Sequence, residues 1–238
     1  MSQGECTYMP HAEGTIRGKG ERLFRKFAYR VWKGELNRYR RRTARSALRV
    51  VDVGCGPGFL LQCLGDWFPT FELMGVDANE RLLDVMRSRC KTAQGVKGDA
   101  SSLPLENVSC DVVFAFHVIE HMKDPARLLA EARRILRPDG LLVIATPNAQ
   151  GLAARLLKRR WVGFSDPTHI SLYGPSFWRG LVQEAGFSIQ HDGTTGLSGI
   201  PLFNRVPLGL IHWIPSFFCG HYPWDLGEAY ICVALKVA

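Results

Sequence analysis

The stretch Val50–Leu61, which reads V-V-D-V-G-C-G-P-G-F-L-L, constrains the fold of this chain more than any other part. Its valine-rich start is typical of a buried parallel strand, and an apolar, helix-compatible run follows the turn. Three glycines, Gly54, Gly56 and Gly58, allow a ligand to approach the backbone closely because no Cβ intervenes. N–H groups at the start of the following helix favour polar or anionic ligand groups. The stretch therefore predicts a strand–loop–helix unit that binds a ligand at its turn.

The spacing of the glycines narrows the choice of ligand. A dinucleotide-binding loop reads G-x-G-x-x-G, whereas the glycines here alternate and Asp52 lies two residues before the first of them. A structural turn without a ligand is the alternative interpretation. The candidate binding residues in this stretch are Asp52, Gly54, Cys55, Gly56, Gly58 and Phe59.

Strand-like and helix-like runs alternate after the glycine turn, which predicts a parallel sheet with helical crossovers. The strands are expected at 71–77, 95–97, 110–116, 141–145, 187–191 and 229–237, and helices at 79–91 and 125–137. Ligands in such sheets bind at the carboxyl ends of the strands. Asp77, Asp99, His117 and Asn148 all fall at or just past those ends.

Asp77 lies nineteen residues after Gly58, about the distance at which a βαβ unit delivers an acid to the hydroxyls of a ribose. A carboxylate accepts two hydrogen bonds from a vicinal diol, so an acid suits this position better than an amide. The alternative is a plain N-cap of the following helix.

The chain has 238 residues and a net charge of +8, and residues 1–49 hold 13 of the 30 basic but only 4 of the 22 acidic residues. The length suits one α/β domain with additions. The basic part could meet nucleic acid, phosphorylated metabolites or an anionic membrane, or form a solvated helix face. The seven cysteines include no C-x-x-C pair, and no apolar run marks a secretory signal. We therefore expect a reduced, cytoplasmic protein.

Residues 48–148 resemble the class I S-adenosylmethionine-dependent methyltransferases. The resemblance rests on the D-x-G-x-G-x-G turn and on F-x-F-H-V-I-E-H-M-x-D-P followed by L-R-P-D-G-L-L-V-I-A-T-P-N. It is strongest with the small-molecule branch that includes the ubiquinone-biosynthesis O-methyltransferases. Residues 151–190 add a segment with D-P-T-H-I that is similar to methyltransferases of bacterial glycan, lipid and natural-product pathways. Residues 1–30 and 197–224 lie outside the resemblance.

The resemblance implies a Rossmann-like, doubly wound α/β fold. The sheet would have seven mostly parallel strands, helices on both faces and an antiparallel last strand. It also implies S-adenosylmethionine as cofactor and S-adenosylhomocysteine as product. Beyond the glycine turn, the expected cofactor contacts are Asp77, Ala78, Asp99, Ala100 and His117, with Asp99 at the adenine amino group. A simple turn aspartate is the alternative for Asp99.

We expect methyl transfer to a hydroxyl of a small molecule. The sulfonium methyl is already electrophilic, so the protein must place the acceptor in line and remove its proton. Histidine suits that proton transfer near neutral pH. We expect His169 to be the base with Asp166 holding its tautomer, and His121 and Glu120 to be the other catalytic candidates.

A metal ion is a second way to activate a hydroxyl. His117, Glu120 and His121 stand at i, i+3 and i+4, one face of a helical turn. The ubiquinone-pathway relatives carry glutamate at the first position, so His117 would suit a nitrogen-preferring ion better than Mg²⁺. No metal is assigned on this basis alone; capping and cofactor contact are the alternatives.

We expect residues 1–48 to form an arm and a basic lid helix, and 49–238 to form the methyltransferase domain. Insertions at 151–175 and 197–224 would cap the substrate. The apolar run within 197–224 is too short and too broken by proline to span a bilayer. It could cover an apolar pocket, meet a membrane or second subunit, or pack on its own domain.

Together with basic arms at 38–45 and 155–160, this segment favours an apolar, lipid-linked or phosphate-bearing acceptor and peripheral membrane contact. Two other functions stay open. A nucleic-acid methyltransferase is favoured by the arginine run but lacks an appended RNA-binding module and an N-P-P-Y-type motif. A non-catalytic cofactor-binding protein is disfavoured by the intact acids and glycines.

Overall fold

A single mixed sheet organises the protein, whose computed structural model describes residues 29–195 and 225–237. The strand order is β3-β2-β1-β4-β5-β7-β6, and β7 runs antiparallel to its neighbours β5 and β6. The strands are β1 (Arg49–Val53), β2 (Glu72–Asp77), β3 (Ala93–Lys97), β4 (Cys110–Phe116), β5 (Leu136–Pro147), β6 (Phe187–Thr194) and β7 (Ala229–Lys236). The predicted Rossmann-like sheet with its antiparallel last strand is confirmed.

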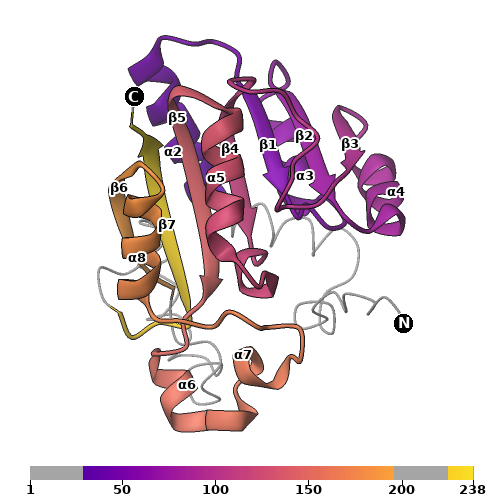
Figure 1. The fold of residues 1–238 in the computed structure, drawn as a ribbon. Coiled ribbons are helices and arrows are strands. Elements are labelled where there is room, and N and C mark those ends of the chain that lie inside the picture. Colours follow the sequence, from indigo (N-terminus) through magenta and orange to yellow (C-terminus); the bar gives the residue numbers. More distant parts are fainter. Residues whose placement is uncertain (1–28, 196–224, 238) are drawn as a thin grey trace, which may run out of the picture.

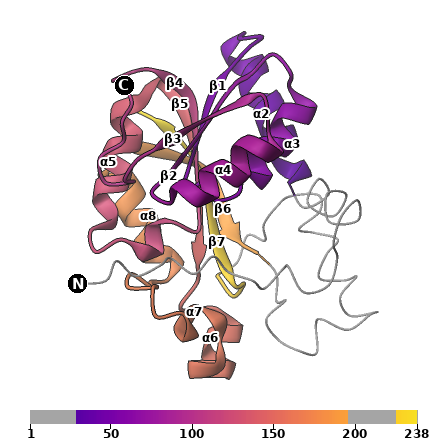
Figure 2. The ribbon, with the colours of Figure 1, turned by 90° about the vertical axis from the view of Figure 1, so that its right-hand side faces the viewer.

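The central strands are apolar along almost their whole length because both of their faces are covered. Four of the five residues of β1 are buried, as are the first six residues of β4. The covering helices are α2 (Arg30–Thr43), α3 (Phe59–Trp67), α4 (Glu80–Arg89), α5 (Pro125–Ile135) and α8 (Pro175–Glu184). Buried side chains of α2, α3 and α4 share one core cluster, and those of α5 and α8 share the other. The sheet is therefore doubly wound, as Figures 1 and 2 show.

Short elements occupy the loops at the carboxyl ends of β4 and β5. A 3₁₀ turn, η2 (Ile119–His121), follows β4. After β5 come α6 (Leu152–Leu157), the 3₁₀ turn η3 (Lys158–Arg160) and α7 (Val162–Ser165). Figure 1 shows α6 and α7 beyond the end of β5, at the edge of the sheet where cofactors bind in this architecture.

Helix α2 lies along β4 in the opposite direction. Near its start, Trp32 contacts the rings of Phe114 and Phe116, with centroids 6.1 and 5.3 Å away. Just beyond its end, Arg45 donates to Asp111 near the amino end of β4. The arginines at 38–45 therefore lie towards the amino edge of the sheet, whereas residues 155–160 follow its carboxyl edge. The two basic runs therefore lie at opposite edges of the sheet.

The boundary between α5 and β5 differs from the prediction. The helix ends at Ile135 and β5 begins at Leu136, although a helix to 137 and a strand from 141 were expected. Pairing with β4 jumps from Cys110–Leu136 to Val112–Leu141, so the residues 137–140 bulge opposite Asp111. Nη1 of Arg137 donates hydrogen bonds to both carboxylate oxygens of Asp111, at 2.9 and 3.0 Å. These bonds hold the bulge against the sheet.

Several predictions concern residues outside the described ranges. These are the arm at 1–20, the first part of the lid helix and the insertion 197–224. The described part of the lid helix, α2, contributes Leu36 and Tyr39 to the main core. The five described cysteines are free and buried, as apolar thiols are expected to be. Among the described residues no helix has the length and apolar character needed to cross a bilayer.

Candidate functional site

The glycine turn after β1 adopts backbone angles that favour glycine. Gly54, Gly56 and Gly58 have φ of 68°, 49° and 76°, the left-handed region in which a Cβ is unfavourable. A Cβ on Gly54 would also lie 2.2 Å from Cγ2 of Val118, in the loop after β4. The turn is thus wedged between β2 and the β4 loop, at the point where the strand order reverses.

Asp77, at the end of β2, holds this turn from the other side. One carboxylate oxygen accepts the Gly56 N–H at 2.9 Å and the other accepts the Asn79 N–H at 2.8 Å. The side chain of Asn79, not that of Asp77, caps α4 by accepting the Arg81 N–H. The N-cap alternative for Asp77 therefore does not hold, and each of its oxygens keeps a lone pair for a ligand.

The predicted side chains Asp52, Cys55 and Phe59 lie deeper. Burial, and then the charge of Asp77, raise the pKa of Asp52 to about 8, so this carboxyl is mostly protonated near neutral pH. The Cys55 thiol is buried under Gly75, where a Cβ would lie 2.6 Å from its Sγ. A ligand at the turn would therefore meet the backbone of Cys55 rather than its thiol.

Arg89 braces the turn, and sequence reasoning missed it. Its guanidinium donates to the Pro57 carbonyl at 2.8 Å and stands 3.7 Å from the centre of the Phe59 ring. The side chain of Phe59 is therefore engaged by a cation. The residue lies at the last position of α4, thirty-two positions after Pro57, and no local pattern indicates such a contact.

Asp99 follows β3 in a tight turn and is exposed. One of its oxygens accepts both the Ser101 N–H and the Ser101 hydroxyl, each at 2.7 Å. These bonds lower the pKa of Asp99, so it is ionised at neutral pH, and its second oxygen takes no part in the turn. One oxygen of Asp99 therefore has the structural role in the turn that the alternative interpretation gave it, and the other oxygen can accept from a ligand. Ala100 is the next residue of the same turn.

His117 directly follows β4 and has a strained conformation. Its φ is 55°, which is uncommon for a residue with a side chain and concentrates at functional sites. Its Nδ1 lies 3.1 Å from Oε1 of the fully buried Glu120, whose Oε2 accepts from Thr146. Partial removal of the imidazole from water lowers the pKa of His117, but 53% of the side chain stays accessible to solvent, so this effect is limited. The hydrogen bond and the charge of Glu120 outweigh it, and the pKa of His117 is raised.

The D-P-T-H-I segment folds back onto the turn after β4. The N–H groups of Ile170 and Ser171 both donate to the Glu120 carbonyl, at 3.0 and 2.9 Å. The Ser171 hydroxyl donates to the Met122 carbonyl at 2.6 Å. These bonds place a loop from beyond β5 beside the end of β4, so residues forty-nine positions apart share one site.

Both histidines of this site have a defined tautomer. Nδ1 of His121 lies 3.1 Å from the Thr168 carbonyl, and Nδ1 of His169 lies 2.8 Å from the Gly163 carbonyl. A carbonyl oxygen can only accept, so each Nδ1 carries the proton and each Nε2 is basic. The two rings meet edge to face with centroids 4.8 Å apart. His169 is completely buried and its Nε2 has no hydrogen-bond partner within the described structure.

Two expectations about this cluster need correction. The tautomer of His169 is held by Gly163; Asp166 accepts instead from the N–H and hydroxyl of Thr168, and its nearer oxygen is 3.8 Å from Nε2. The grouping expected for a metal, His117 with Glu120 and His121, is also wrong. The donor atoms that converge within 4.8 Å of one another belong to Glu120, His121 and His169.

Asn148, the last of the predicted strand-end residues, has a structural role. It is fully buried, and its side-chain amide donates to the carbonyls of Asp225 and Gly227, both at 2.8 Å. It therefore ties the end of β5 to the segment that enters β7.

Comparison with known proteins decides the family. A family described as "Methyltransferase domain" matches residues 24–192. The chain belongs to this methyltransferase family.

Relatives and solved structures agree with this assignment. A probable S-adenosylmethionine-dependent methyltransferase of Mycobacterium tuberculosis is 37% identical over 114 residues, 46% of this chain and 40% of the relative. A malonyl-[acyl-carrier protein] O-methyltransferase of Methylococcus capsulatus is 32% identical over 160 residues, 64% of this chain and 57% of the relative. The alignments thus span only about half the length of these relatives or less. A Pyrococcus horikoshii protein has the same fold, with a TM-score of 0.64, 19% identity and 96% of each chain covered.

The methyltransferase uses S-adenosylmethionine, and the residues at its glycine turn fit this cofactor. The positive φ angles bring bare backbone to the surface of the turn, and the ionised Asp99 and the Asp77 carboxylate stand at the ends of neighbouring strands. These acids offer acceptors for hydroxyl and amino groups, which S-adenosylmethionine carries at opposite ends of its nucleoside.

We predict a pH-dependent stability from His117 and Glu120. Because the folded-state pKa of His117 is raised, the interaction stabilises fully below the ordinary histidine pKa of about 6.5 and is lost as the pH rises through the raised value. The melting temperature of Glu120→Gln should therefore approach that of the wild-type enzyme as the pH rises from about 6 to about 9. Glu106→Gln, at an exposed site, is the control. A Glu120→Gln deficit that is constant with pH would contradict the prediction.

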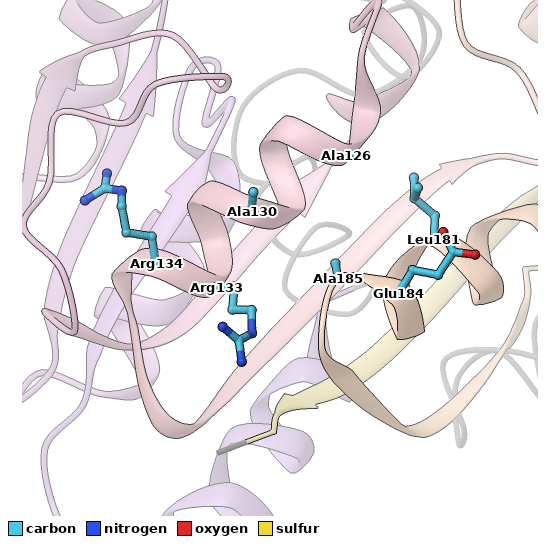
Figure 3. Close-up of a pocket in the computed structure, with 7 residues that line it drawn as sticks. All are labelled: Ala126, Ala130, Arg133, Arg134, Leu181, Glu184 and Ala185. Carbon is cyan, nitrogen blue, oxygen red and sulfur yellow. The ribbon is translucent and has the colours of Figure 1, made fainter.

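A separate groove of about 540 Å³ lies between α5 and α8 (Figure 3). Its walls are small and charged side chains from the two helices: Ala126, Ala130, Arg133, Arg134, Leu181, Glu184 and Ala185. None of the site residues described above lines it, so this groove is separate from the candidate site.

Proposed function

We propose that this enzyme methylates a hydroxyl oxygen of a small molecule, with a histidine of the His121–His169 cluster as general base. The observation that carries the proposal is the pair of fixed tautomers, which leaves a basic Nε2 on each ring beside the strand ends. S-adenosylmethionine supplies an electrophilic methyl group when bound. The chain's own residues then orient the acceptor and take its proton.

The cofactor contacts follow from the placement of the acids. Asp77 is proposed to accept from the ribose hydroxyls and Asp99 from the adenine amino group, with Ala78 and Ala100 beside them. The backbone of Gly54, Cys55, Gly56 and Gly58 would face the amino-acid portion, and Asp52, Phe59 and His117 would complete the surround. Because Asp52 is buried and its pKa is raised to about 8, we propose that its protonated carboxyl takes part in hydrogen bonds without carrying a charge.

Between the two histidines, accessibility favours His121 as the group that touches the acceptor. His121 is partly exposed, whereas the side chain of His169 is completely buried behind it. We propose that His169 positions His121 through their ring contact, and that Asp166 and Glu120 hold the two loops. The original expectation of His169 as base remains the competing version of the same proposal.

We expect His121→Ala to lower turnover by about 10²–10⁴-fold, the usual contribution of a general base. His169→Ala should lower it less, because the base itself is still present. His191→Ala, at a histidine on β6, is the matched control. Near-wild-type turnover of both His121→Ala and His169→Ala on a true substrate would rule out base catalysis by this cluster.

The convergence of Glu120, His121 and His169 calls for a chelator test. A histidine base requires no ion, so turnover should survive EDTA treatment and dialysis. Loss of turnover that is restored by Zn²⁺ or Co²⁺ would show instead that the three side chains hold a metal that activates the hydroxyl.

The acceptor class rests on a relative and on the segments that would cover the site. A relative named as a malonyl-[acyl-carrier protein] O-methyltransferase favours oxygen as the acceptor atom. We propose an apolar, lipid-linked or phosphate-bearing molecule, capped by residues 151–175 and 197–224, in a cytoplasmic enzyme with membrane contact through 197–224. The nucleic-acid alternative loses support because the two basic runs lie at opposite edges of the sheet. Screening phenols, sugars and lipid-linked alcohols with labelled methyl donor tests this choice.

A further inference from the structure

Residues 151–165 form a small unit of their own, here called the basic projection. Ala153, Ala154 and Trp161 make its separate apolar cluster, and Trp161 contacts the Phe164 ring edge to face at 5.0 Å. Figures 1 and 2 both show α6 and α7 extending past the carboxyl ends of the strands. The unit therefore presents a preformed surface at the edge where the site lies.

The charge of the basic projection is uniform. It carries Arg155, Lys158, Arg159 and Arg160 and contains no acidic residue. All four side chains are exposed, and within the described residues none of them takes part in a side-chain hydrogen bond or ion pair. Lys158 has φ of 48° and ψ of −126°, so the chain holds a lysine in a turn that would favour glycine. These cations have no electrostatic role inside the described fold.

Large apolar side chains are exposed beside these cations. Leu156 in α6 is 62% exposed and Phe164 in α7 is 44% exposed. Exposed apolar groups interleaved with cations are the composition of a surface that rests on lipid headgroups, with the cations meeting phosphates and the apolar groups entering the acyl boundary. A nucleic-acid surface would use the cations but would gain little from an aliphatic side chain such as Leu156.

We propose that the basic projection docks the enzyme on an anionic phospholipid bilayer. Charge complementarity identifies the occupant, and the apolar pair distinguishes a bilayer from a soluble polyanion. Because α6 follows the carboxyl end of β5, docking turns the carboxyl edge of the sheet towards the membrane. The proposal concerns described residues only and does not depend on which acceptor the enzyme methylates.

The test is co-sedimentation of the full chain with phosphatidylcholine vesicles that do or do not contain phosphatidylglycerol. Binding is expected only to the anionic vesicles and should weaken in high salt. Each cation near an anionic surface contributes about fivefold in partitioning, so Arg159→Gln/Arg160→Gln should weaken binding ~25-fold. Leu156→Ser/Phe164→Ser should weaken it by at least about tenfold at unchanged charge.

The matched control is Arg41→Gln/Arg42→Gln, which removes two exposed cations at the last turn of α2. Calorimetric binding of S-adenosylhomocysteine verifies that each variant is folded. Equal weakening by the control pair, or no effect of the apolar pair, would overturn the proposal in favour of unspecific charge attraction. Binding of a single-stranded RNA oligomer that is lost in Arg159→Gln/Arg160→Gln, without vesicle binding, would overturn it in favour of nucleic acid.

Discussion

Asp77→Ala should lose binding of S-adenosylmethionine and S-adenosylhomocysteine by about 10²–10⁴-fold. The carboxylate orients its two oxygens through the N–H groups of Gly56 and Asn79, and the two proposed hydrogen bonds from ribose hydroxyls to this charged group are worth about 1.5–3 kcal/mol each. Its removal takes away the side-chain support of the glycine turn, whose Gly54 and Cys55 N–H groups still donate to the Val76 carbonyl of β2, in addition to the loss of the proposed ribose contacts. Calorimetric titration with both ligands measures the effect.

Two further variants make this result interpretable. Asp77→Asn keeps one acceptor oxygen and should bind with intermediate affinity. Asp84→Ala removes an exposed carboxylate on α4 that pairs with Arg87, so it should bind like the wild-type enzyme. Unchanged affinity in Asp77→Ala would mean that the cofactor binds elsewhere.

Gly54→Ala should destabilise the protein by about 2–5 kcal/mol. The left-handed backbone costs a residue with a Cβ about 1–2 kcal/mol, and overpacking against a neighbour costs about 1–3 kcal/mol more. Here the neighbour is Cγ2 of Val118, 2.2 Å from the added Cβ. Urea unfolding monitored by circular dichroism gives the change in free energy.

The double variant Gly54→Ala/Val118→Ala separates the two costs. Removing the valine methyl groups relieves the contact but leaves the backbone conformation unfavourable. The pair should therefore be more stable than the sum of the single changes indicates, by about 1–3 kcal/mol. Simple additivity would contradict the wedging of the glycine turn against the β4 loop.

Local pattern was sufficient for the fold. The apolar runs of β1, β2 and β4 and the alternating glycines report on neighbouring residues, so reading them in order places Asp77 at the end of β2 and Asp99 just after β3, as in the structure. Where local signals compete, the prediction failed. A helix to 137 and a strand from 141 were expected, but the hydrogen bonds from Arg137 to Asp111 hold residues 137–140 within β5 as a bulge.

The acceptor side could not be read from the sequence in the same way. That His169 meets His121 depends on backbone hydrogen bonds between Ile170, Ser171 and Glu120, and no periodicity encodes them. The helical spacing of His117, Glu120 and His121 suggested one shared face, whereas the 3₁₀ geometry of η2 and the strained His117 send the first histidine elsewhere. This part of the site is formed by contacts between residues that lie far apart in the sequence.

The antiparallel strand β7 lies between β5 and β6, although it is synthesised after both of them. On the ribosome, β6 therefore emerges before the strand that links it to the rest of the sheet. Until β7 arrives, one edge of the apolar strand β5 leaves its backbone N–H and C=O groups unpaired, the condition under which nascent chains associate with one another or with chaperones. Completion of this enzyme is thus a late event of its biosynthesis, and premature termination upstream of Ala229 would yield a species prone to aggregation rather than a smaller working domain.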